Sequence, residues 1–199
     1  MAYTDPRVIR SKQALRDAMR ELLRERPYKE ITGILVTERA LLGQATLYRH
    51  YKNLDDLLLD VFSTDAQDLA ARMLEQNTVL DEAITLYTYV RDNQICTRLF
   101  LQLPSDHPAR RQSAELFRQL ITARYLQREG ATVPYDLSAL HIIESVNRLI
   151  GWYLDRIDEY SPEEIAQMHI DLIVMPTVSA TLDLRGDWVQ HHAVHSQTK

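Results

Sequence analysis

The sequence runs from Gly43 to Pro104 without another glycine or proline. Because these two residues supply the backbone conformations of tight turns, such a stretch favours helices over the short strands and frequent turns of β-sandwiches and barrels. The whole chain of 199 residues contains only 5 glycines and 7 prolines. Its length is sufficient for one domain or two small ones with a hydrophobic core. The sequence therefore predicts an all-α protein.

Helical spacing of apolar residues, together with capping and turn signals, divides the chain into segments. The first helix follows a cap at Thr4-Asp5-Pro6 and ends at Pro27. Two short helices are expected next, one from Thr32 to Ala40 and one over about 44–50. Later helices are predicted at about 53–76, 79–91, 93–103, 107–129 and 136–158, and a last one from Ser161 to roughly 180, kinked or ended early by Pro176. We expect the tail after about residue 184 to be frayed.

Charge is divided unevenly along the chain. Residues 1–52 hold 11 Lys and Arg against 6 Asp and Glu, whereas residues 53–199 hold 12 against 22. A basic N-terminal segment joined to an acidic remainder is typical of a nucleic-acid-binding module on a regulatory body. An arginine-rich, solvated helix surface is the alternative explanation. We predict domains at 1–52 and 53–199.

Several classes of protein are disfavoured by what the sequence lacks. Cys96 is the single cysteine, which excludes an intramolecular disulfide and fits a reducing compartment. Charged residues within the first twelve positions argue against a signal segment, and no apolar run approaches the roughly 20 residues of a membrane span. We find no recognisable nucleophile motif or glycine-rich phosphate loop, and His191, His192 and His195 are interpreted as a solvated tail. The expectation is a cytoplasmic protein that is not an enzyme, has no membrane partner, and needs no metal or cofactor.

Residues 32–58 carry the strongest functional signal. Two short helices joined by a tight turn behind one long helix form a helix-turn-helix, whose second helix enters the DNA major groove. Gln44 and Thr46 stand at the start of that helix, where a Gln side chain can pair with adenine and a Thr methyl can touch thymine. Leu47, Tyr51, Leu57 and Leu58 are expected to anchor the unit to its core. The predicted DNA-binding residues are Thr32, Gln44, Ala45, Thr46, Tyr48, Arg49, His50 and Lys52.

This segment resembles the N-terminal DNA-binding domain of the TetR (tetracycline-repressor-type) family of bacterial transcriptional regulators. The resemblance covers about residues 7–62 and rests on Ile31-Thr32, Thr37-Glu38-Arg39-Ala40, the run Ala45 to Tyr51, and the run Lys52 to Leu58. It implies an N-terminal three-helix DNA-binding domain followed by a helical ligand-binding and dimerisation domain. In function, it implies a homodimeric repressor that a small apolar or amphipathic effector releases from a palindromic, double-stranded DNA operator.

Two positions depart from the pattern of that family. Its members usually place glycine at the position of Leu41 and a Ser or Thr cap at the position of Gly43, and a cation near Leu54 is also missing. Because a left-handed conformation is costly for leucine, we expect the turn to have a different shape here. The departures also leave open an alternative function, a helical protein-interaction module that keeps the fold but has lost specific DNA binding.

Helix 136–158 is apolar around nearly its whole circumference, which predicts burial on every side. One face would pack within the chain and another against a second subunit, although a central helix of a monomeric bundle would show the same pattern. With the last helix, it supplies the predicted dimer interface of Ile142, Val146, Leu149, Trp152, Tyr153, Ile165, Met168, Leu172 and Ile173.

The resemblance further implies an apolar ligand pocket between helices 79–91, 107–129 and 136–158. The residues predicted to line it are Tyr87, Phe100, Phe117 and His141. His141, Glu144 and Asn147 interrupt the apolar helix at helical spacing, so they are either satisfied core groups or ligand contacts. Cys96, among apolar neighbours, is interpreted as a small buried hydrophobe.

Overall fold

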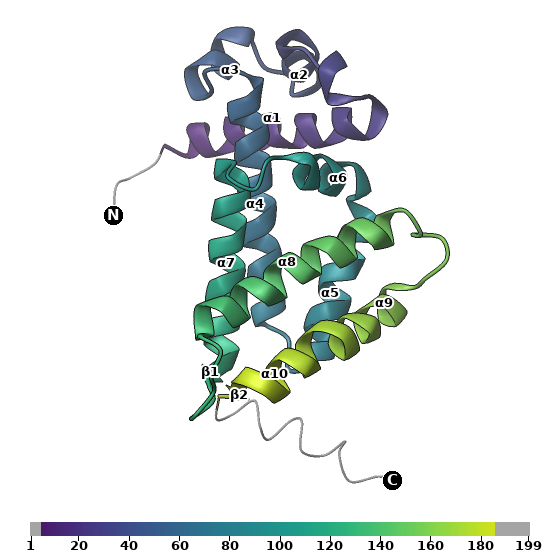
Figure 1. Cartoon of the computed structure of the whole chain (residues 1–199). Helices are drawn as coiled ribbons and strands as arrows, with labels where there is room; N and C mark the ends of the chain where they lie inside the picture. The colour runs from purple at the N-terminus through teal and green to yellow at the C-terminus, as the bar shows by residue number, and fades with distance from the viewer. Residues whose placement is uncertain (1–4, 186–199) are drawn as a thin grey trace. The chain divides into compact units, whose positions relative to one another are not determined.

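A computed structural model describes residues 5–185 and confirms the all-α fold (Figure 1). The chain divides into two compact units, Met1–Asp65 and Ala66–Lys199. This division lies inside α4 (Leu54–Leu74), later than the boundary expected after residue 52. The reason is that the first turns of α4 supply ion-pairing aspartates to the first unit, as described below.

The first unit contains α1 (Pro6–Glu25), the 3₁₀ turn η1 (Tyr28–Glu30), α2 (Gly33–Arg39), α3 (Gln44–His50) and the first turns of α4. Asp5 caps α1 by accepting a hydrogen bond from the backbone N–H of Arg7, and proline occupies the first turn. Helix α1 buries one apolar stripe and contacts both α2 and α3 (Figure 1). The stripe consists of Leu15, Ala18, Met19, Leu22 and Leu23.

The second unit consists of the last turns of α4 and the elements that follow. These are α5 (Val79–Asp92), α6 (Gln94–Gln102), α7 (Pro108–Arg124), β1 (Tyr125–Gln127), α8 (Tyr135–Leu154), α9 (Pro162–His169), the π-turn η2 (Ile170–Val174), α10 (Met175–Thr181) and β2 (Leu182–Leu184). Helix α9 packs along α5, and α8 contacts α5, α6, α7 and α9. The predicted capping box is present, because Ser161 accepts from the N–H of Glu164 and the Glu164 side chain accepts from the N–H of Ser161.

Helix α8 contributes to both hydrophobic clusters of this unit. Its C-terminal half, with Ile150, Tyr153 and Leu154, belongs to one hydrophobic cluster with α5 and α9. Its N-terminal half, with Ala139 and Ile142, belongs to a second cluster with the C-terminal end of α7, η2 and the two strands. The buried residues recur at helical spacing, so α8 buries one face along its length within the chain and leaves Leu137, Leu140 and Trp152 exposed; the predicted burial on every side is not found in the single chain.

Helix α7 ends at Arg124, earlier than the predicted end near 129, because the chain continues as a strand. Strands β1 and β2 pair antiparallel, with Tyr125 opposite Leu184 and Gln127 opposite Leu182. Leu182 is fully buried, and the Arg128 guanidinium donates to its carbonyl oxygen at 3.1 Å. The partners are far apart in the sequence, so local periodicity carries no sign of the pairing.

The last helix is interrupted before Pro176 rather than at it. A proline inside an α-helix lacks the N–H that would bond to the preceding turn, and its ring collides with that carbonyl. Here the wider π-turn Ile170–Val174 precedes the proline, and α10 then begins with Pro176 in its first turn. The helical path thus reaches Thr181. The predicted frayed tail beyond Arg185, with its three histidines, lies outside the described residues.

Candidate DNA-binding surface and effector cavity

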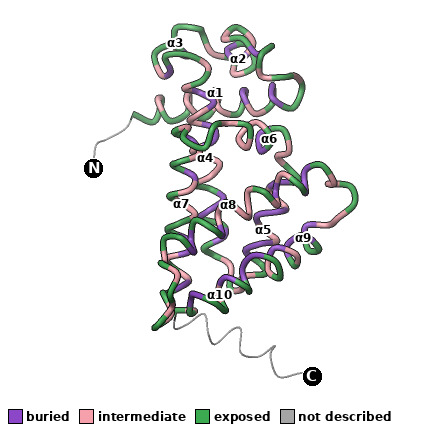
Figure 2. The backbone as a smooth tube through the Cα atoms, viewed as in Figure 1, coloured by how far each residue is buried: buried purple, intermediate pink, exposed green. Residues whose placement is uncertain are grey.

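Helix α3 is held by one apolar anchor and exposes most of its side chains. Leu47 is its one buried residue. The rest of α3 is exposed or intermediate (Figure 2). Gln44, Ala45, Tyr48 and Arg49 are exposed. The N-terminal end and outer face of a helix presented in this way can reach base edges in a major groove. These four residues were predicted from the sequence, and the structure leaves all of them accessible.

The start of α2 packs closely against α3. Thr32 caps α2, since its Oγ1 accepts a hydrogen bond from the N–H of Leu35 at 3.3 Å. A Cβ at Gly33 would lie 2.8 Å from Tyr48 Oη and 3.3 Å from Leu47 Cδ2. Glycine at this position therefore allows the two short helices to approach each other. Thr32 is exposed as well as capping, so its methyl group and hydroxyl remain at the surface.

The turn between α2 and α3 corrects one expectation. Leu41 has φ 54°, which is the left-handed conformation that we expected leucine to avoid. The expectation of a different turn shape is therefore wrong. The turn is closed by a 2.9 Å hydrogen bond from the N–H of Leu42 to the carbonyl of Thr37, and Leu41 is 91% exposed. Gly43 has the extended conformation usual for an N-cap residue (φ −76°, ψ 150°), but glycine has no side chain, so α3 starts without a side-chain cap.

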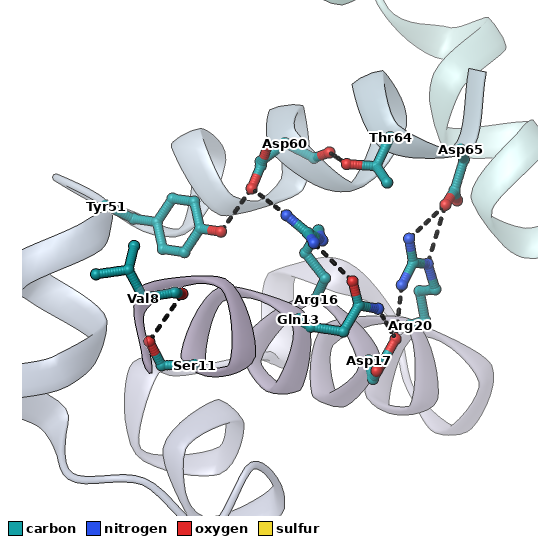
Figure 3. Close-up of polar contacts among 10 residues, drawn as sticks. All are labelled: Val8, Ser11, Gln13, Arg16, Asp17, Arg20, Tyr51, Asp60, Thr64 and Asp65. Atoms are coloured by element: carbon teal, nitrogen blue, oxygen red, sulfur yellow. Dashed lines mark hydrogen bonds and ion pairs between the residues drawn. The ribbon is translucent and has the colours of Figure 1, made fainter. Parts of the chain in front are cut away.

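A polar network fixes the residue that follows α3 (Figure 3). The Tyr51 hydroxyl donates to Asp60 Oδ2 at 2.6 Å, and Arg16 Nη1 donates to the same oxygen at 3.0 Å. Arg20 forms a second pair with Asp65 at 2.5 Å. Burial by itself raises the pKa of Asp60, but the hydrogen bonds from Tyr51 and Arg16 outweigh it and hold that pKa below its usual value.

Sequence reasoning identified Tyr51 as an anchor but missed its polar partners. Arg16 and Arg20 are one helical turn apart on α1, and Asp60 and Asp65 lie on α4. Such a charge pattern on two helices could have indicated the pairing. In a segment with many arginines, however, the sequence offers too many alternative pairs to choose among them.

The remaining predicted DNA-binding side chains differ in whether they already contact other groups of the protein. His50 Nε2 lies 2.7 Å from Ser11 Oγ, and burial, with Arg49 and Lys12 nearby, lowers the pKa of its ring. Arg49 donates to Thr46 Oγ1 at 3.1 Å. The side chain of Lys52 is exposed, while its backbone N–H donates to Asp56 Oδ2 at the start of α4. Thr46 and His50 are thus partly engaged, and Lys52 extends from a fixed backbone.

The second unit contains an apolar cavity of about 90 Å³. Four polar residues, Glu82, Arg124, Asn147 and His169, interrupt its otherwise apolar wall. The apolar lining residues are Met73, Val79, Ala83, Leu86, Phe117, Leu120, Ile121, Tyr125, Ile142, Ile143, Val146, Ile150 and Val174. They come from α4, α5, α7, β1, α8 and η2, so the cavity lies among the three helices between which the ligand pocket was expected.

The four predicted ligand-binding residues are placed differently. Phe117 lines the cavity. Phe100 lines a neighbouring hollow that Phe117 also borders. Tyr87 is fully buried beside the ring of His169 without lining the cavity. His141 lies outside the cavity and is exposed, because the side of α8 that carries it is turned away from the lining residues Ile142 and Val146.

Among the polar residues of the cavity wall, Asn147 was named from the sequence as either a core group or a ligand contact, whereas Glu82, Arg124 and His169 were not predicted. Arg124 Nε donates to Glu82 Oε1 at 2.9 Å, and Arg124 Nη2 donates to the carbonyls of Leu74 and Gln76 at 2.8 and 3.0 Å. Burial raises the pKa of Glu82 to about 7, although Arg124 partly offsets the effect. Burial lowers the pKa of His169 to about 4. The signal that could have found these groups is a polar residue at a position where helical periodicity predicts an apolar one.

The residues predicted for a dimer interface divide by exposure. Four of them are buried within the single chain, where they are not accessible to a partner: Ile142, Tyr153, Ile165 and Ile173. Val146, Leu149 and Met168 are half-buried and pack against the core clusters. Trp152 and Leu172 are exposed. Other exposed apolar residues on the same helices are Leu137, Leu140 and Met175.

Residues 5–185 show neither a membrane-spanning helix nor a cluster of metal ligands. No helix in this part of the chain combines the length and the apolar character that a membrane crossing requires. Within the same residues, no three His, Cys, Asp or Glu side chains come together as ligands for a metal ion. Cys96 is buried, as expected.

The described residues thus form an all-α chain with an N-terminal helix-turn-helix unit and a separate helical unit that contains an apolar cavity. Comparison of the sequence finds no matching family model and no matching curated protein. Comparison of the structure finds many similar solved chains, and among them are regulators of the TetR family.

Three solved structures illustrate the similarity. The transcriptional regulator FadR from Bacillus subtilis, solved with stearoyl-CoA, has a TM-score of 0.62 and 14% identity over 81% of this chain and 97% of its own. A TetR transcriptional regulator from Streptococcus agalactiae has a TM-score of 0.59 and 20% identity over 85% and 96%. SmeT, the repressor of a multidrug efflux pump of Stenotrophomonas maltophilia, has a TM-score of 0.62 and 13% identity over 88% and 92%. The fold is that of TetR-type regulators.

Proposed function

We propose that this protein is a DNA-binding transcriptional regulator that acts as a homodimer and responds to a small ligand. The observation that carries the proposal is the exposed face of α3, on a short helix that Leu47 anchors and Gly33 allows to pack against α2. The similarity of the whole fold to TetR-type regulators supports the same function. We propose that Gln44, Ala45 and Thr46 contact the DNA bases.

In this proposal, different residues contact the phosphates and the bases of the DNA. Gln44 is exposed at the first position of α3, where it can pair with an adenine edge, and Thr46 can place its methyl group near thymine. Thr32, Tyr48, Arg49, His50 and Lys52 surround them with hydroxyl and cationic groups suited to the DNA backbone. The Tyr51–Asp60 hydrogen bond would hold the end of α3 while these contacts form.

A single helix-turn-helix unit offers few contacts, so two joined units would bind far more tightly. Exposed apolar side chains on α8 and around η2, including Trp152, Leu172 and Met175, supply the surface that we assign to the dimer. A two-fold dimer would read an inverted repeat. We further propose that the protein is a repressor and that the ligand occupies the apolar cavity. The two helix-turn-helix units of a dimer could stand at different distances from each other. A ligand that binds more tightly at one of these spacings would change operator affinity.

The DNA-binding proposal is tested by fluorescence titration with genomic DNA fragments at two salt concentrations, followed by selection of preferred sites. Phosphate-driven binding must weaken steeply with salt. Lys52→Ala should weaken binding to all sequences and reduce the salt slope by about one. Gln44→Ala should cost about 1–3 kcal/mol on the best site and relax its preference at one or two base pairs.

Lys29→Ala serves as a matched control, because Lys29 is an exposed cation of the same unit that lies outside α3. It should leave both the salt slope and the selected site unchanged. A selected-site profile that Gln44→Ala does not alter would contradict the placement of α3 on DNA. Weak binding that is insensitive to salt would favour the alternative of a helical protein-interaction module.

A further inference from the structure

Two adjoining hollows lie along α8, where this helix contacts α6 and α7. The larger, of about 530 Å³, lies between α6 and α8, and the smaller, of about 270 Å³, lies between α7 and α8. Ser105, Arg110, Glu144 and Asn147 line both, so the two hollows form one continuous surface, which we call the arginine groove. Each hollow exceeds the roughly 150 Å³ of an engineered cavity that accepts benzene, so a small molecule has room in the groove.

The charge of the arginine groove is opposite to that of the unit that contains it. Residues 66–199 hold 12 Lys and Arg against 18 Asp and Glu. The lining of the groove reverses this balance with four arginines against two carboxylates, namely Arg98, Arg110, Arg111 and Arg148 against Glu144 and Asp155. A concave surface with an excess of one sign of charge attracts small ions of the opposite sign. The groove therefore favours an anion.

Two of these arginines have no carboxylate partner among the described residues. Arg98 is already paired with Asp155 at 2.7 Å. Arg110 and Arg148, in contrast, form no ion pair with any described residue. The guanidinium of Arg110 instead packs over the ring of Phe100, with its carbon 5.2 Å from the ring centroid. A ligand carboxylate would thus meet two cations whose charge is not yet compensated.

Arg110 lies where the charged part of the groove meets an apolar part. Its Nη1 is buried and closed to a ligand, but the residue as a whole is half-buried and lines both hollows. Beyond it, the smaller hollow is walled by Phe100, Phe117, Leu140 and Ile143. A guanidinium pairs well with a planar carboxylate, and the apolar wall beside it suits a hydrocarbon group.

We propose that the arginine groove binds a small amphipathic monoanion, an alkyl or aryl carboxylate. Its carboxylate pairs with Arg110 and Arg148, and its apolar part lies in the smaller hollow against Phe117. Glu144, which lines both hollows, would repel a second negative charge and so disfavours dianions and polyanions. This site is additional to the apolar cavity assigned to the effector, and the inference requires neither DNA binding nor an effector role.

The test compares octanoate with 1-octanol, which keeps the chain and replaces the carboxylate by a hydroxyl-bearing carbon. Affinities for the full chain without DNA are measured by calorimetry or ligand-observed NMR at neutral pH and low salt. Wild type should bind octanoate more tightly than octanol. The ratio of the two affinities should fall about tenfold in Arg110→Gln, because a charge-assisted hydrogen bond is lost. Arg148→Gln, a change at an exposed residue, should lower the ratio as well and decides if Arg110→Gln does not fold.

Three controls separate charge, space and screening. Arg118→Gln removes an exposed arginine of α7 that pairs with Glu115 and lines neither hollow, so it should leave the ratio unchanged. Ala114→Phe narrows the smaller hollow and should weaken octanoate and octanol together. Added salt should weaken octanoate but not octanol, because it screens exposed charges.

Equal affinities of wild type for octanoate and octanol would overturn the inference, as would octanoate binding that neither Arg110→Gln nor Arg148→Gln weakens. Trp152, assigned above to the dimer surface, borders the larger hollow, so both variants are also examined by sedimentation velocity. Loss of association with unchanged octanoate affinity would show that the groove is an interface between two copies of the chain, and would likewise overturn the inference. Loss of operator binding with the octanoate preference intact would instead contradict the proposed function alone.

Discussion

The hydroxyl of Tyr51 donates to Oδ2 of Asp60 across 2.6 Å, which ties the residue after α3 to α4. The same oxygen accepts from Arg16, so α1 joins the contact. The exposed side chains of α3 can act on DNA only if the helix keeps its position, and this three-residue contact fixes its C-terminal end. The Lys12 ammonium, 5.3 Å from the centre of the Tyr51 ring, adds a cation–π contact.

We expect Tyr51→Phe to destabilise the first unit by about 1.5–3 kcal/mol, the usual range for a hydrogen bond to a charged group. The variant keeps the ring and removes only the donor. Hydrogen exchange of the α3 amides and denaturation in urea measure the change. Tyr28→Phe is the control, because Tyr28 donates to Asp55, an exposed carboxylate, and its loss should cost less. Equal losses in the two variants would show that Tyr51 has no special role.

Leu41→Gly should stabilise the first unit by about 1 kcal/mol. Leucine at φ 54° carries left-handed strain that glycine does not, and its exposed side chain contributes little packing. Leu41→Ala should leave stability nearly unchanged, since alanine keeps a Cβ and therefore the strain. Thermal denaturation of the two variants separates strain from side-chain loss. A glycine variant that melts below wild type would contradict the account of the turn.

Leu172→Glu should convert the proposed dimer into a folded monomer. Leu172 is 69% exposed within the chain, so a charge there costs little in the monomer but would be buried in the proposed interface. Sedimentation velocity at micromolar concentration measures the state of association, and circular dichroism checks folding. Leu126→Glu, at an exposed residue of β1, should leave the dimer intact. A wild-type chain that is monomeric and still binds one operator tightly would refute the dimer.

The buried Glu82 should make wild type lose stability, relative to Glu82→Gln, as the pH rises from about 4.5 to 7. Its folded-state pKa is raised to about 7 from 4.5. In that window the folded state binds more protons than the unfolded state, so stability falls with increasing pH. Thermal melting of both proteins at pH 4.5, 6 and 7.5 gives the slopes. Parallel curves would show that Glu82 titrates normally.

His169 should act in the opposite direction. Its pKa is lowered to about 4 from 6.5, so its contribution is complete above pH 6.5 and is lost as the pH falls toward 4. Compared with His169→Phe, wild type should therefore lose stability on acidification. The same melting series, extended to pH 4, measures the difference. A constant difference across the range would contradict the burial of the ring.

The predicted helices largely follow from signals within each segment. Pro6, Thr32, the Gly43–Gln44 junction and the Ser161–Glu164 capping box mark helix starts that the structure reproduces. These signals work because a cap, a proline or a glycine changes the local backbone free energy whatever its distant neighbours are. The exposed residues of α3 also follow from local signals, since one buried leucine determines the orientation of so short a helix.

The end of α7 was decided by a contact between distant segments, because Tyr125 leaves the helix to pair with Leu184. The π-turn at Ile170–Val174, in contrast, accommodates the nearby Pro176 and has a local cause. Leu41 is another case in which contacts between helices override a local preference. Its intrinsic preference opposes a left-handed conformation, but the packing of α2 against α3 imposes that conformation and outweighs a strain of about 1–2 kcal/mol.

The sequence alone determined the helical class, the position of the helix-turn-helix and the accessible residues of α3, because local periodicity and capping suffice for them. Only the tertiary structure decided which face of α8 lines a cavity and which is exposed, since that helix is apolar nearly all around. It also decided that His169, rather than His141, borders the cavity. The physical reason is that burial and pairing of a polar side chain depend on neighbours from other helices, which no single segment specifies.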